Sequence, residues 1–583
     1  MKNLQLTNIK NKVDYKNIFY LGEWCLKNSE IELKKRSIIP YHWNSLKKLE
    51  KDHKYINNLH QKISKALFKS LNKIHKKNYS DKSWGVIFEP FLQYYITILL
   101  DRWEITRKAF LKKNKYQVSF HGIKNISFEM HDYTKLFFTD EWNQNLFQNI
   151  INFQYKKKVR ITKGEKIILK SEPYSKISKT FYTIFKDTVK KCFNILLAKV
   201  TRGNHFFFVQ HYFDIKSFVK LNLLLKQIPV SHNYFEGIEN IKIFNGKKDQ
   251  KLRNQLFKNI KTKNNFEKFL IYSLKNDITS NIIENFNLIL NEALKIKQKP
   301  KVILSAGLHW SDLLFKSWLA EKINNGTKFL SIEHGGSLPF KYPYFFFEEN
   351  NSNRFITWFK EHHQNQKQLP AQKLLRYEKL ANYNYKPKKC YLILDRISRY
   401  TLTLAKPVSS NYFTYINDIC NLYKTLNLEV KNEFNIKLHP ADSDKVWNTK
   451  KFLKHRLKTQ IAPDNKSITD SFLESKLTIC FYPETTFAEC VRIGIPCVLY
   501  VSPRMHKIHP ISKKLFNHLM KVGIIFDDVN LMALHVNKIW IDPQKWWNSS
   551  KIVNARNFFE KEALCFDEKD SLLKWCKFLK TFK

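Results

Sequence analysis

"KLTICFYPETTFAECVRIGIPCVLY", residues 476–500, is the stretch that decides the fold. A continuous apolar run ends near residue 482, a helical pattern opens at Glu484, and Gly494 leads into a second apolar run. Continuous apolar runs of this length are typical of strands that are buried on both faces of a parallel sheet. We therefore expect a β-α-β unit whose helix begins at the carboxyl edge of the sheet.

The same alternation of strands and helices extends over both halves of the chain. Comparable apolar runs, with helical patterns between them, lie at 301–307, 328–336, 390–396 and 434–440. This pattern predicts an α/β fold with two doubly wound, Rossmann-like domains that face a cleft. The polar stretch 382–389 separates the two series, so we place the domains at 1–385 and 386–583.

The amino-terminal half carries helical insertions. The segment 45–78 is amphipathic, and 84–112 is more apolar. The apolar run at 84–100 is interrupted by polar residues and is shorter than the roughly 20 residues that a membrane span needs, so we predict a buried helix. The lysine-rich segment 139–200 is the expected irregular region, and "KNIFYLGEWCL" at 16–26 is the expected first strand and its turn.

Length and charge limit the class of protein. The chain has 583 residues, 101 Lys+Arg against 51 Asp+Glu, and a net charge of +50. Such a charge attracts anionic partners: nucleic acid, lipid headgroups or phosphorylated substrates. The lysines are spread along the whole chain, however, as in proteins from AT-rich genomes. The nine cysteines show no zinc-type spacing and the first residues lack a signal-peptide core, which predicts a cytoplasmic protein.

The helix that opens at Thr485 is a candidate anion site. Its first-turn amides, the hydroxyls of Thr485 and Thr486, and the positive end of the helix dipole would all face the sheet edge. Glu489, about one turn further on, is placed to accept hydrogen bonds from sugar hydroxyls. The alternative is an ordinary capped helix of an α/β domain.

Cationic side chains follow two neighbouring strands of the same half. "FNIKLHP" places Lys437 and His439 at a strand end, and Arg399 follows "CYLILDR" closely. Ammonium, imidazole and guanidinium groups at such an edge would hold a phosphate with charge-assisted hydrogen bonds. The alternatives are a surface histidine and a solvated turn.

A glycine pair marks the edge of the other predicted sheet. In "FLSIEHGGSLPF" (329–340) His334 precedes Gly335 and Gly336, although the chain contains only 13 glycines. Glycine allows a close approach to the backbone, so we interpret the pair as a ligand contact beside a histidine. "LSAGLHWSD" repeats the arrangement with His309, and a tight turn is the alternative in both cases.

Seven short motifs together resemble a known family. They are "LGEWCL", "YHW", "LLDRWE", "EHGG", "RISRY", "ETTFAE" and "WWN…AR", in that order over nearly the whole chain. They resemble the transferases of bacterial O-antigen and surface-polysaccharide gene clusters, which are similar to GT-B glycosyltransferases. The resemblance implies that a histidine-proline pair and a threonine-rich helix start hold a donor nucleotide. The matching positions are His439, Pro440, Thr485, Thr486 and Glu489.

One position departs from the pattern of that family. Glu484 stands at the start of the helix, where small polar residues are usual. A carboxylate there would repel phosphate unless it turned toward the ribose or the base.

The predicted enzyme transfers a sugar from a nucleotide-activated donor, CMP-linked or NDP-linked, to an O-antigen or capsule acceptor by direct displacement. Glu23 is the first choice of base, with His309 and His334 as rivals, and no metal ion is expected. The acceptor would be a glycan or a lipid-linked glycan, with peripheral contact to the anionic inner face of the cytoplasmic membrane. The predicted donor-binding residues are Arg399, Lys437, His439, Pro440, Glu484, Thr485, Thr486 and Glu489, and the predicted substrate-binding residues are Gly22, Ser305, Gly335 and Gly336.

Three alternatives stay open at this point. A polyol-phosphate transferase on the same scaffold would use a CDP-alditol donor. A basic nucleic-acid-binding protein would bind arbitrary RNA or DNA with a steep dependence on salt. A non-catalytic scaffold for glycan assembly would keep the fold without the activity.

Overall fold

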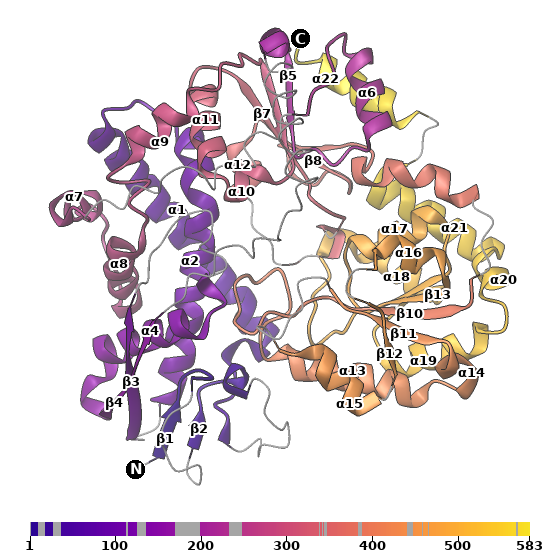
Figure 1. Cartoon of the computed structure of the whole chain (residues 1–583), viewed down its shortest axis with the longest axis horizontal. Coiled ribbons are helices and arrows are strands. Elements are labelled where there is room, and N and C mark those ends of the chain that lie inside the picture. Colours follow the sequence, from indigo (N-terminus) through magenta and orange to yellow (C-terminus); the bar gives the residue numbers. More distant parts are fainter. Residues whose placement is uncertain are drawn as a thin grey trace, which may run out of the picture.

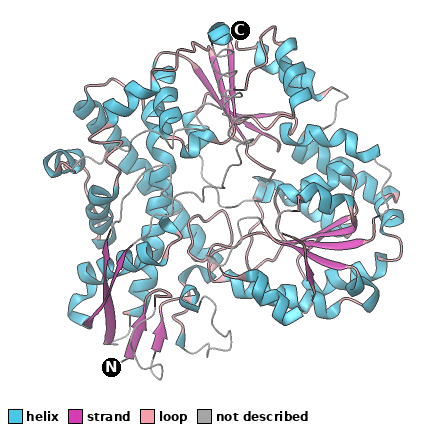
Figure 2. Cartoon of the chain, viewed as in Figure 1, coloured by secondary structure: helices cyan, strands magenta, loops and turns pink. Residues whose placement is uncertain are grey.

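The computed structural model describes residues 2–9, 18–26, 37–111, 115–124, 136–168, 199–231, 248–336, 338–340, 342, 347–382, 387–439, 447–457, 459–463, 466–566 and 570–583. Within these residues the strands form three parallel sheets (Figures 1 and 2). Two of them are flanked by helices and lie in the two halves of the chain, which confirms the predicted α/β class.

The carboxyl-terminal sheet has the doubly wound topology. Its order is β12-β11-β10-β13-β14-β15. This order corresponds to 3-2-1-4-5-6 of the Rossmann fold, in which ligands bind where the order reverses. The reversal lies between β10 and β13, and Ile393 of β10 is paired with Lys437 on one side and Cys480 on the other. The strands are β10 (Lys389–Ile393), β11 (Phe434–Lys437), β12 (Gln460–Ile461), β13 (Ser475–Cys480), β14 (Cys497–Tyr500) and β15 (Ile525–Phe526).

The second sheet is sequential, in the order β5-β6-β7-β8-β9. Its strands are β5 (Phe206–Val209), β6 (Val302–Ser305), β7 (Lys328–Ile332), β8 (Arg354–Thr357) and β9 (Gln366–Gln368). Ser305 is paired with Ser331, so the loops after β6 and β7 leave the sheet at the same edge. The last helix, α22 (Ser571–Lys580), returns to this sheet, where Trp575 and Leu579 join the core. The predicted division at residue 385 stays a prediction.

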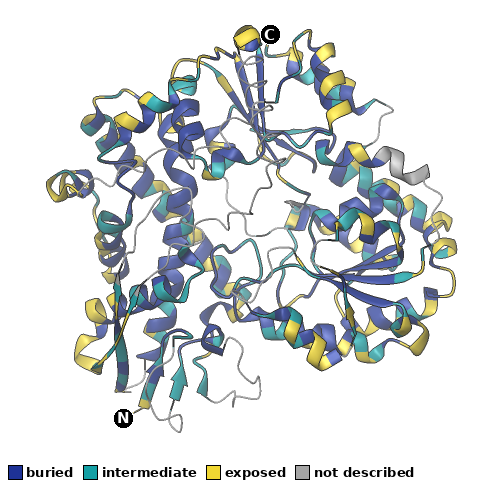
Figure 3. Ribbon diagram, in the orientation of Figure 1, coloured by how far each residue is buried: buried dark blue, intermediate teal, exposed yellow. Residues whose placement is uncertain are grey.

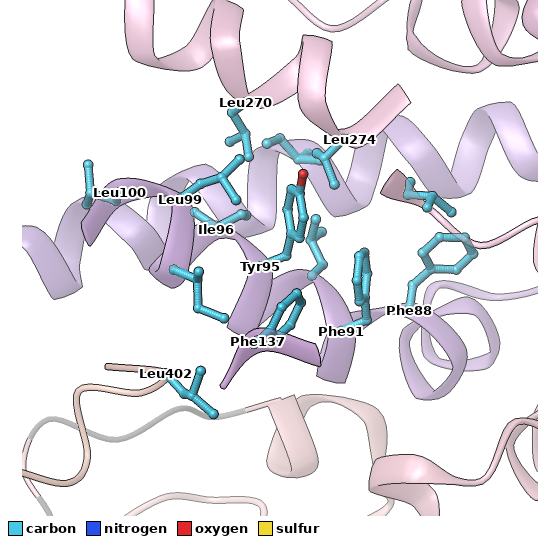
Figure 4. Close-up of a cluster of buried hydrophobic side chains, with 14 of the residues drawn as sticks. Phe88, Phe91, Tyr95, Ile96, Leu99, Leu100, Phe137, Leu270, Leu274 and Leu402 are labelled. Carbon is cyan, nitrogen blue, oxygen red and sulfur yellow. The ribbon is translucent and has the colours of Figure 1, made fainter. Parts of the chain in front are cut away.

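Two long helices confirm the predicted helical insertions. They are α1 (Leu46–His75) and α2 (Asp81–Ala109), each capped by a serine hydroxyl that accepts a backbone N–H in the first turn. Helix α2 is buried along most of its length (Figure 3). Figure 4 shows Tyr95 and Leu99 of α2 close to Leu274 of a neighbouring helix. Among the described residues, no helix is long and apolar enough to span a bilayer.

The amino-terminal sheet corrects two expectations. Its order is β2-β1-β3-β4, with β1 (Lys2–Gln5), β2 (Ile18–Tyr20), β3 (Tyr116–Lys124) and β4 (Val159–Ile168). A strand therefore precedes the expected first one. A regular strand also lies inside the segment expected to be irregular, because a long register with β3 stabilises its lysine-rich sequence.

The remaining helices cover the sheets or connect the strands. Their bounds are α4 (Asp140–Ile150), α6 (Ile215–Leu224), α7 (Gln250–Phe257), α8 (Asn265–Asp277), α9 (Phe286–Ala293), α10 (Leu308–Ser311), α11 (Leu313–Asn324), α12 (Phe347–Asn351), α13 (Asn411–Thr425), α14 (Leu428–Asn432), α15 (Thr449–Leu457), α16 (Ile468–Leu473), α17 (Thr485–Ile493), α18 (Lys513–Lys521), α19 (Val529–Ile539), α20 (Pro543–Trp547) and α21 (Ser550–Phe559). Short 3-10 segments include η2 (Glu23–Leu26), η9 (Leu338–Phe340) and η10 (Gln372–Asn382).

Candidate active site

A cleft of about 880 Å³ lies between the two large sheets. The loops after β6 and β7 line it on one side, and the loops after β10, β11 and β13 line it on the other. The carboxyl ends of parallel strands are the usual ligand-binding edge of such sheets. The predicted residues that line this cleft are His334, Gly335, Lys437, His439, Glu484, Thr485, Thr486 and Glu489.

The glycine pair allows the two sides of the cleft to approach each other. A Cβ atom at Gly335 would collide with Oγ1 of Thr485, and one at Gly336 would lie 2.7 Å from the ring of Trp358. Thr485 belongs to the opposite side of the cleft, at the start of α17. The interpretation of the pair as a ligand contact is corrected accordingly: the backbone here makes room for protein, although Gly335 also lines the cleft.

The acidic start of α17 is compensated by a lysine. Lys406 Nζ lies 3.2 Å from Glu484 Oε1 and 3.7 Å from Asp395 Oδ2. Burial, together with the nearby Glu484, raises the pKa of Asp395 to about 6, although Lys406 opposes this shift. The carboxylate of Glu484 is therefore held in an ion pair, which weakens the repulsion that a free carboxylate would exert on a bound phosphate.

The hydroxyl of Thr486 is part of the same edge. Tyr482 Oη and Thr486 Oγ1 are 2.6 Å apart, and both residues line the cleft. Helix α17 runs for nine residues from Thr485, so its first-turn amides are directed to this edge together with the two threonine hydroxyls.

Lys437 and His439 lie where β11 ends. Lys437 Nζ donates to the carbonyl oxygens of Pro463 (3.2 Å) and Lys466 (2.6 Å), which fix its ammonium group on the cleft wall. His439 lines the cleft as an exposed residue. Pro440 lies outside the described residues.

Glu489 is a buried acceptor on the same wall. Its side chain is 5 % exposed, and Oε1 accepts a hydrogen bond from Tyr377 Oη at 3.2 Å. Burial raises the pKa of this carboxyl group. A buried carboxylate with few donors has acceptor capacity for ligand hydroxyls.

Of the three candidate bases Glu23, His309 and His334, His334 is the one that lines the cleft. Its Nδ1 donates to the carbonyl oxygen of Ala306 at 3.3 Å, and its ring stands perpendicular to Tyr212 at 4.9 Å. Because Nδ1 carries the proton, Nε2 is the basic nitrogen of the neutral ring. A Cβ atom at Gly307 would lie 2.8 Å from Oε1 of Gln210, so this glycine makes room for the Gln210 side chain, another residue of the cleft.

His309 is buried behind the cleft and not on its surface, which corrects its assignment as a base. Its Nδ1 lies 3.1 Å from Ser305 Oγ and its Nε2 lies 2.7 Å from Glu348 Oε1. Ser331 Oγ also donates to Glu348, at 2.9 Å. Ser305 and His309 thus orient Glu348, a cleft residue that the sequence analysis missed, and Ser305 does not reach a substrate itself.

Gly22 and Glu23 follow strand β2 of the amino-terminal sheet and do not line the cleft. Trp24, beside them, stacks on Phe147 of α4 with ring centroids 6.0 Å apart. A side chain at Gly22 would collide with that indole. The pattern of a strand followed by a turn at 16–26 suggested an active-site edge, but this turn packs against α4. The assignments of Glu23 as the base and of Gly22 as a substrate-binding residue are therefore corrected.

Arg399 forms a buried ion pair instead of a phosphate site. It is 2 % exposed and pairs with Asp140 of α4, to which Tyr400 Oη also donates at 2.5 Å. The sequence places Arg399 correctly after a strand, but Asp140 is 259 residues away in the chain. No local pattern could have predicted this partner.

Two other cleft residues were missed for different reasons. Asp395 is the second-last residue of the stretch "CYLILDR" and could have been found from its position after β10. Lys406 stands in a loop without any periodic signal, and only the fold brings it to Glu484.

The profile of a transferase family matches residues 2–579. The chain belongs to the LIC12162 family of transferases. This membership confirms the transferase class. Two parallel sheets flanked by helices face one cleft, as the predicted GT-B-like class requires, but only the carboxyl-terminal sheet is doubly wound: the order β5-β6-β7-β8-β9 is sequential, which corrects the prediction of two doubly wound domains.

Comparison with solved structures finds partial matches at low sequence identity and low TM-score. MurG of Acinetobacter baumannii is 14 % identical over 50 % of this chain and 76 % of its own, with a TM-score of 0.29. TarM is 14 % identical over 51 % of this chain and 58 % of its own, with a TM-score of 0.32. A variant of the wall teichoic acid polymerase TagF is 12 % identical over 69 % of this chain and 98 % of its own, with a TM-score of 0.30. No curated protein sequence matches the chain.

Proposed function

We propose that this transferase moves a sugar from a nucleotide-activated donor to the hydroxyl group of a glycan acceptor in the cleft. One observation carries the proposal: His334 and the reversal point of the doubly wound sheet face the same cleft from opposite sides. A nucleotide would bind at the reversal point, and an acceptor would bind on the side of His334.

The donor side supplies groups for a nucleotide phosphate and a sugar. The start of α17, with Thr485 and Thr486, and the ammonium group of Lys437 would stabilise the charge that develops on the leaving phosphate. His439 and Glu489 would contact the nucleotide and hydroxyl groups of the donor. Turnover without a metal ion stays a prediction, and in the described residues no cluster of three or more His, Cys, Asp or Glu side chains is arranged as a metal site.

The reaction would be a direct displacement. The acceptor oxygen forms a bond to the anomeric carbon while the bond from that carbon to the phosphate oxygen breaks, and the nucleotide leaves with the electron pair. His334 Nε2 takes the proton of the acceptor hydroxyl, since its tautomer leaves that nitrogen basic. An O-antigen or capsule glycan is the proposed acceptor class, in keeping with the family that the motifs resemble.

The charge of the cleft argues against a nucleic-acid-binding surface. Six carboxylates line it, against four lysines: Glu333, Glu348, Glu349, Asp395, Glu484 and Glu489 against Lys373, Lys406, Lys437 and Lys466. A nucleic-acid groove requires an excess of cations. The net charge of +50 is therefore not concentrated in this cleft.

A panel of nucleotides tests the donor site. CMP, CDP, UDP and GDP are added to the full-length protein, and we expect one of them to raise the melting temperature, because a ligand of the folded state stabilises it. His439→Ala and Glu489→Gln should weaken that nucleotide about tenfold or more, since each removes a charge-assisted hydrogen bond. The exposed His518 on α18 provides the control variant His518→Ala.

Two results would decide against this assignment. Unchanged nucleotide affinity in both His439→Ala and Glu489→Gln would reject the donor site. If CDP raises the melting temperature, and CDP-alditols reproduce this rise while CDP-sugars do not, the result would favour the polyol-phosphate transferase.

Helix α6 is the proposed surface for peripheral contact with the anionic inner face of the cytoplasmic membrane. Ile215 and Leu223 are 82 % and 64 % exposed, and Val219, four residues from each, lies on the same helix face. Lysines 216, 220 and 226 flank this apolar line, and no acidic residue occurs from 215 to 231. Tyr212, three residues before α6, lines the cleft, so a lipid-linked acceptor at this surface would lie near His334.

Flotation with vesicles tests this surface. The full-length protein should float with vesicles that contain phosphatidylglycerol and not with pure phosphatidylcholine, because both apolar insertion and lysine attraction are needed. Val219→Asp with Leu223→Asp should abolish flotation. Leu531→Asp with Leu534→Asp on α19, at residues 60 % and 56 % exposed, is the matched control. Equal loss in both pairs would refute α6 as the surface.

A further inference from the structure

The two walls of the cleft differ in charge. One wall consists of the cleft-lining residues with numbers lower than 360. Its described residues include three glutamates, and they include neither lysine nor arginine. The four cleft lysines all come from residues above 370. In a chain with 101 Lys+Arg, a wall without any of them is unusual. We call the wall of residues with numbers lower than 360, which includes His334, the acceptor wall.

Two aromatic rings are part of the acceptor wall. Tyr94 of α2 and Trp310 of α10 have ring centroids 6.1 Å apart, with their planes at 56°. Trp310 Nε1 donates to Glu348 Oε1 at 3.2 Å, and its ring stands perpendicular to Phe347 at 4.3 Å. The indole is therefore held from two sides. Fixed aromatic rings on a concave surface offer an apolar face to the C–H groups of a sugar ring.

Gln93 offers a hydrogen-bonding group that the protein leaves unused. Its side chain is 3 % exposed and lines the cleft beside Tyr94. Its Oε1 atom is buried and has no hydrogen-bond partner among the described residues. Buried amide oxygens normally have a partner, so an orphan at a cleft surface points to a ligand donor such as a hydroxyl group.

The carboxylate of Glu348 is fixed in place. Its Oε1 accepts hydrogen bonds from His309, Ser331 and Trp310, at 2.7, 2.9 and 3.2 Å. A carboxylate held in this way on the cleft wall accepts hydrogen bonds from hydroxyl groups and repels phosphate.

We propose that the acceptor wall binds the end of the acceptor as an uncharged, hydroxyl-rich pyranose ring. Tyr94 and Trp310 pack on the ring, and Gln93 and Glu348 accept hydrogen bonds from its hydroxyl groups. This inference rests on the proposed function and adds the chemical class of the acceptor. An alditol phosphate end would bring its negative charge beside three glutamates, and Lys406, the lysine whose charge acts on Tyr94, is already paired with Glu484.

Saturation-transfer NMR on the full-length protein tests the wall without an identified acceptor. The probes are the methyl glycosides of glucose, galactose and mannose, compared with sn-glycerol 3-phosphate. We expect transfer to the ring protons of at least one methyl glycoside. Trp310→Ala should weaken that binding about tenfold or more, whereas Tyr272→Ala, at an aromatic residue that is 56 % exposed on α8, should leave it unchanged.

Gln93→Leu and the milder Trp310→Phe extend the test if Trp310→Ala does not fold. Gln93→Leu should weaken the same glycoside, since it keeps the size of the side chain and removes the acceptor atom. Absence of transfer to every glycoside, equal transfer in all variants, or glycerol phosphate binding that depends on Trp310 would overturn the proposal.

The two proposals fail in different experiments. If no nucleotide raises the melting temperature while glycoside binding depends on Trp310, the proposed donor chemistry fails and the wall stands. If a nucleotide binds and no glycoside binding depends on the wall, the proposed function stands and the acceptor class is wrong.

Discussion

Replacing His334 by Ala should lower kcat about 100- to 10,000-fold, which is the range that a positioned general base contributes. The histidine is exposed in the cleft, and its Nδ1 donates to the carbonyl oxygen of Ala306. Its loss should therefore remove the proton acceptor without unfolding the protein. The measurement is the rate of nucleotide release from the donor that the melting-temperature panel selects, with the acceptor present.

Two variants make this result specific. Glu23→Gln should keep kcat near the wild-type value, because Glu23 does not line the cleft. His309→Gln acts through Glu348, so it should weaken acceptor binding more than it lowers kcat at saturating acceptor. A His334→Ala enzyme with a wild-type rate, or a Glu23→Gln enzyme without activity, would return the role of the base to Glu23.

The fold could be predicted largely from local patterns. Continuous apolar runs such as those before Gly307 and Asp395 are strands of the two large sheets, because a strand buried on both faces must be apolar throughout. The long helices were predictable from their periodicity. The strand Val159–Ile168 could not be predicted. Lysines and other polar residues interrupt its apolar residues, so the sequence alone does not show a buried face.

The site could be predicted where it depends on strand ends, and not where it depends on distant contacts. Lys437, His439 and Thr485 follow strands of one sheet, so their position at the cleft edge follows from the parallel topology. The contact between Gly335 and Thr485 requires the two sheets to meet, which no local pattern contains. Glycine scarcity indicated a close approach but not its partner.

Arg399→Met should destabilise the fold by about 3–5 kcal/mol, the usual cost of breaking a buried ion pair. The guanidinium is nearly inaccessible, and its loss leaves the carboxylate of Asp140, 17 % exposed, without its cation. We expect a clear fall in melting temperature, with nucleotide affinity unchanged in the folded protein. The neighbouring Arg396, which lies over the Phe138 ring at 4.7 Å, gives the control variant Arg396→Met.

A double-mutant cycle separates the structural role of Arg399 from a phosphate-binding role. Asp140→Asn together with Arg399→Met should cost less than the sum of the two single changes, because the second change removes a charge that the first has left unpaired. If Arg399 bound phosphate, the outcome would differ: Arg399→Met would weaken nucleotide binding and leave the melting temperature of the free protein unchanged. Arg399 and Asp140 join the loop after β10 to α4, so additive losses would mean that this ion pair does not hold the two elements together.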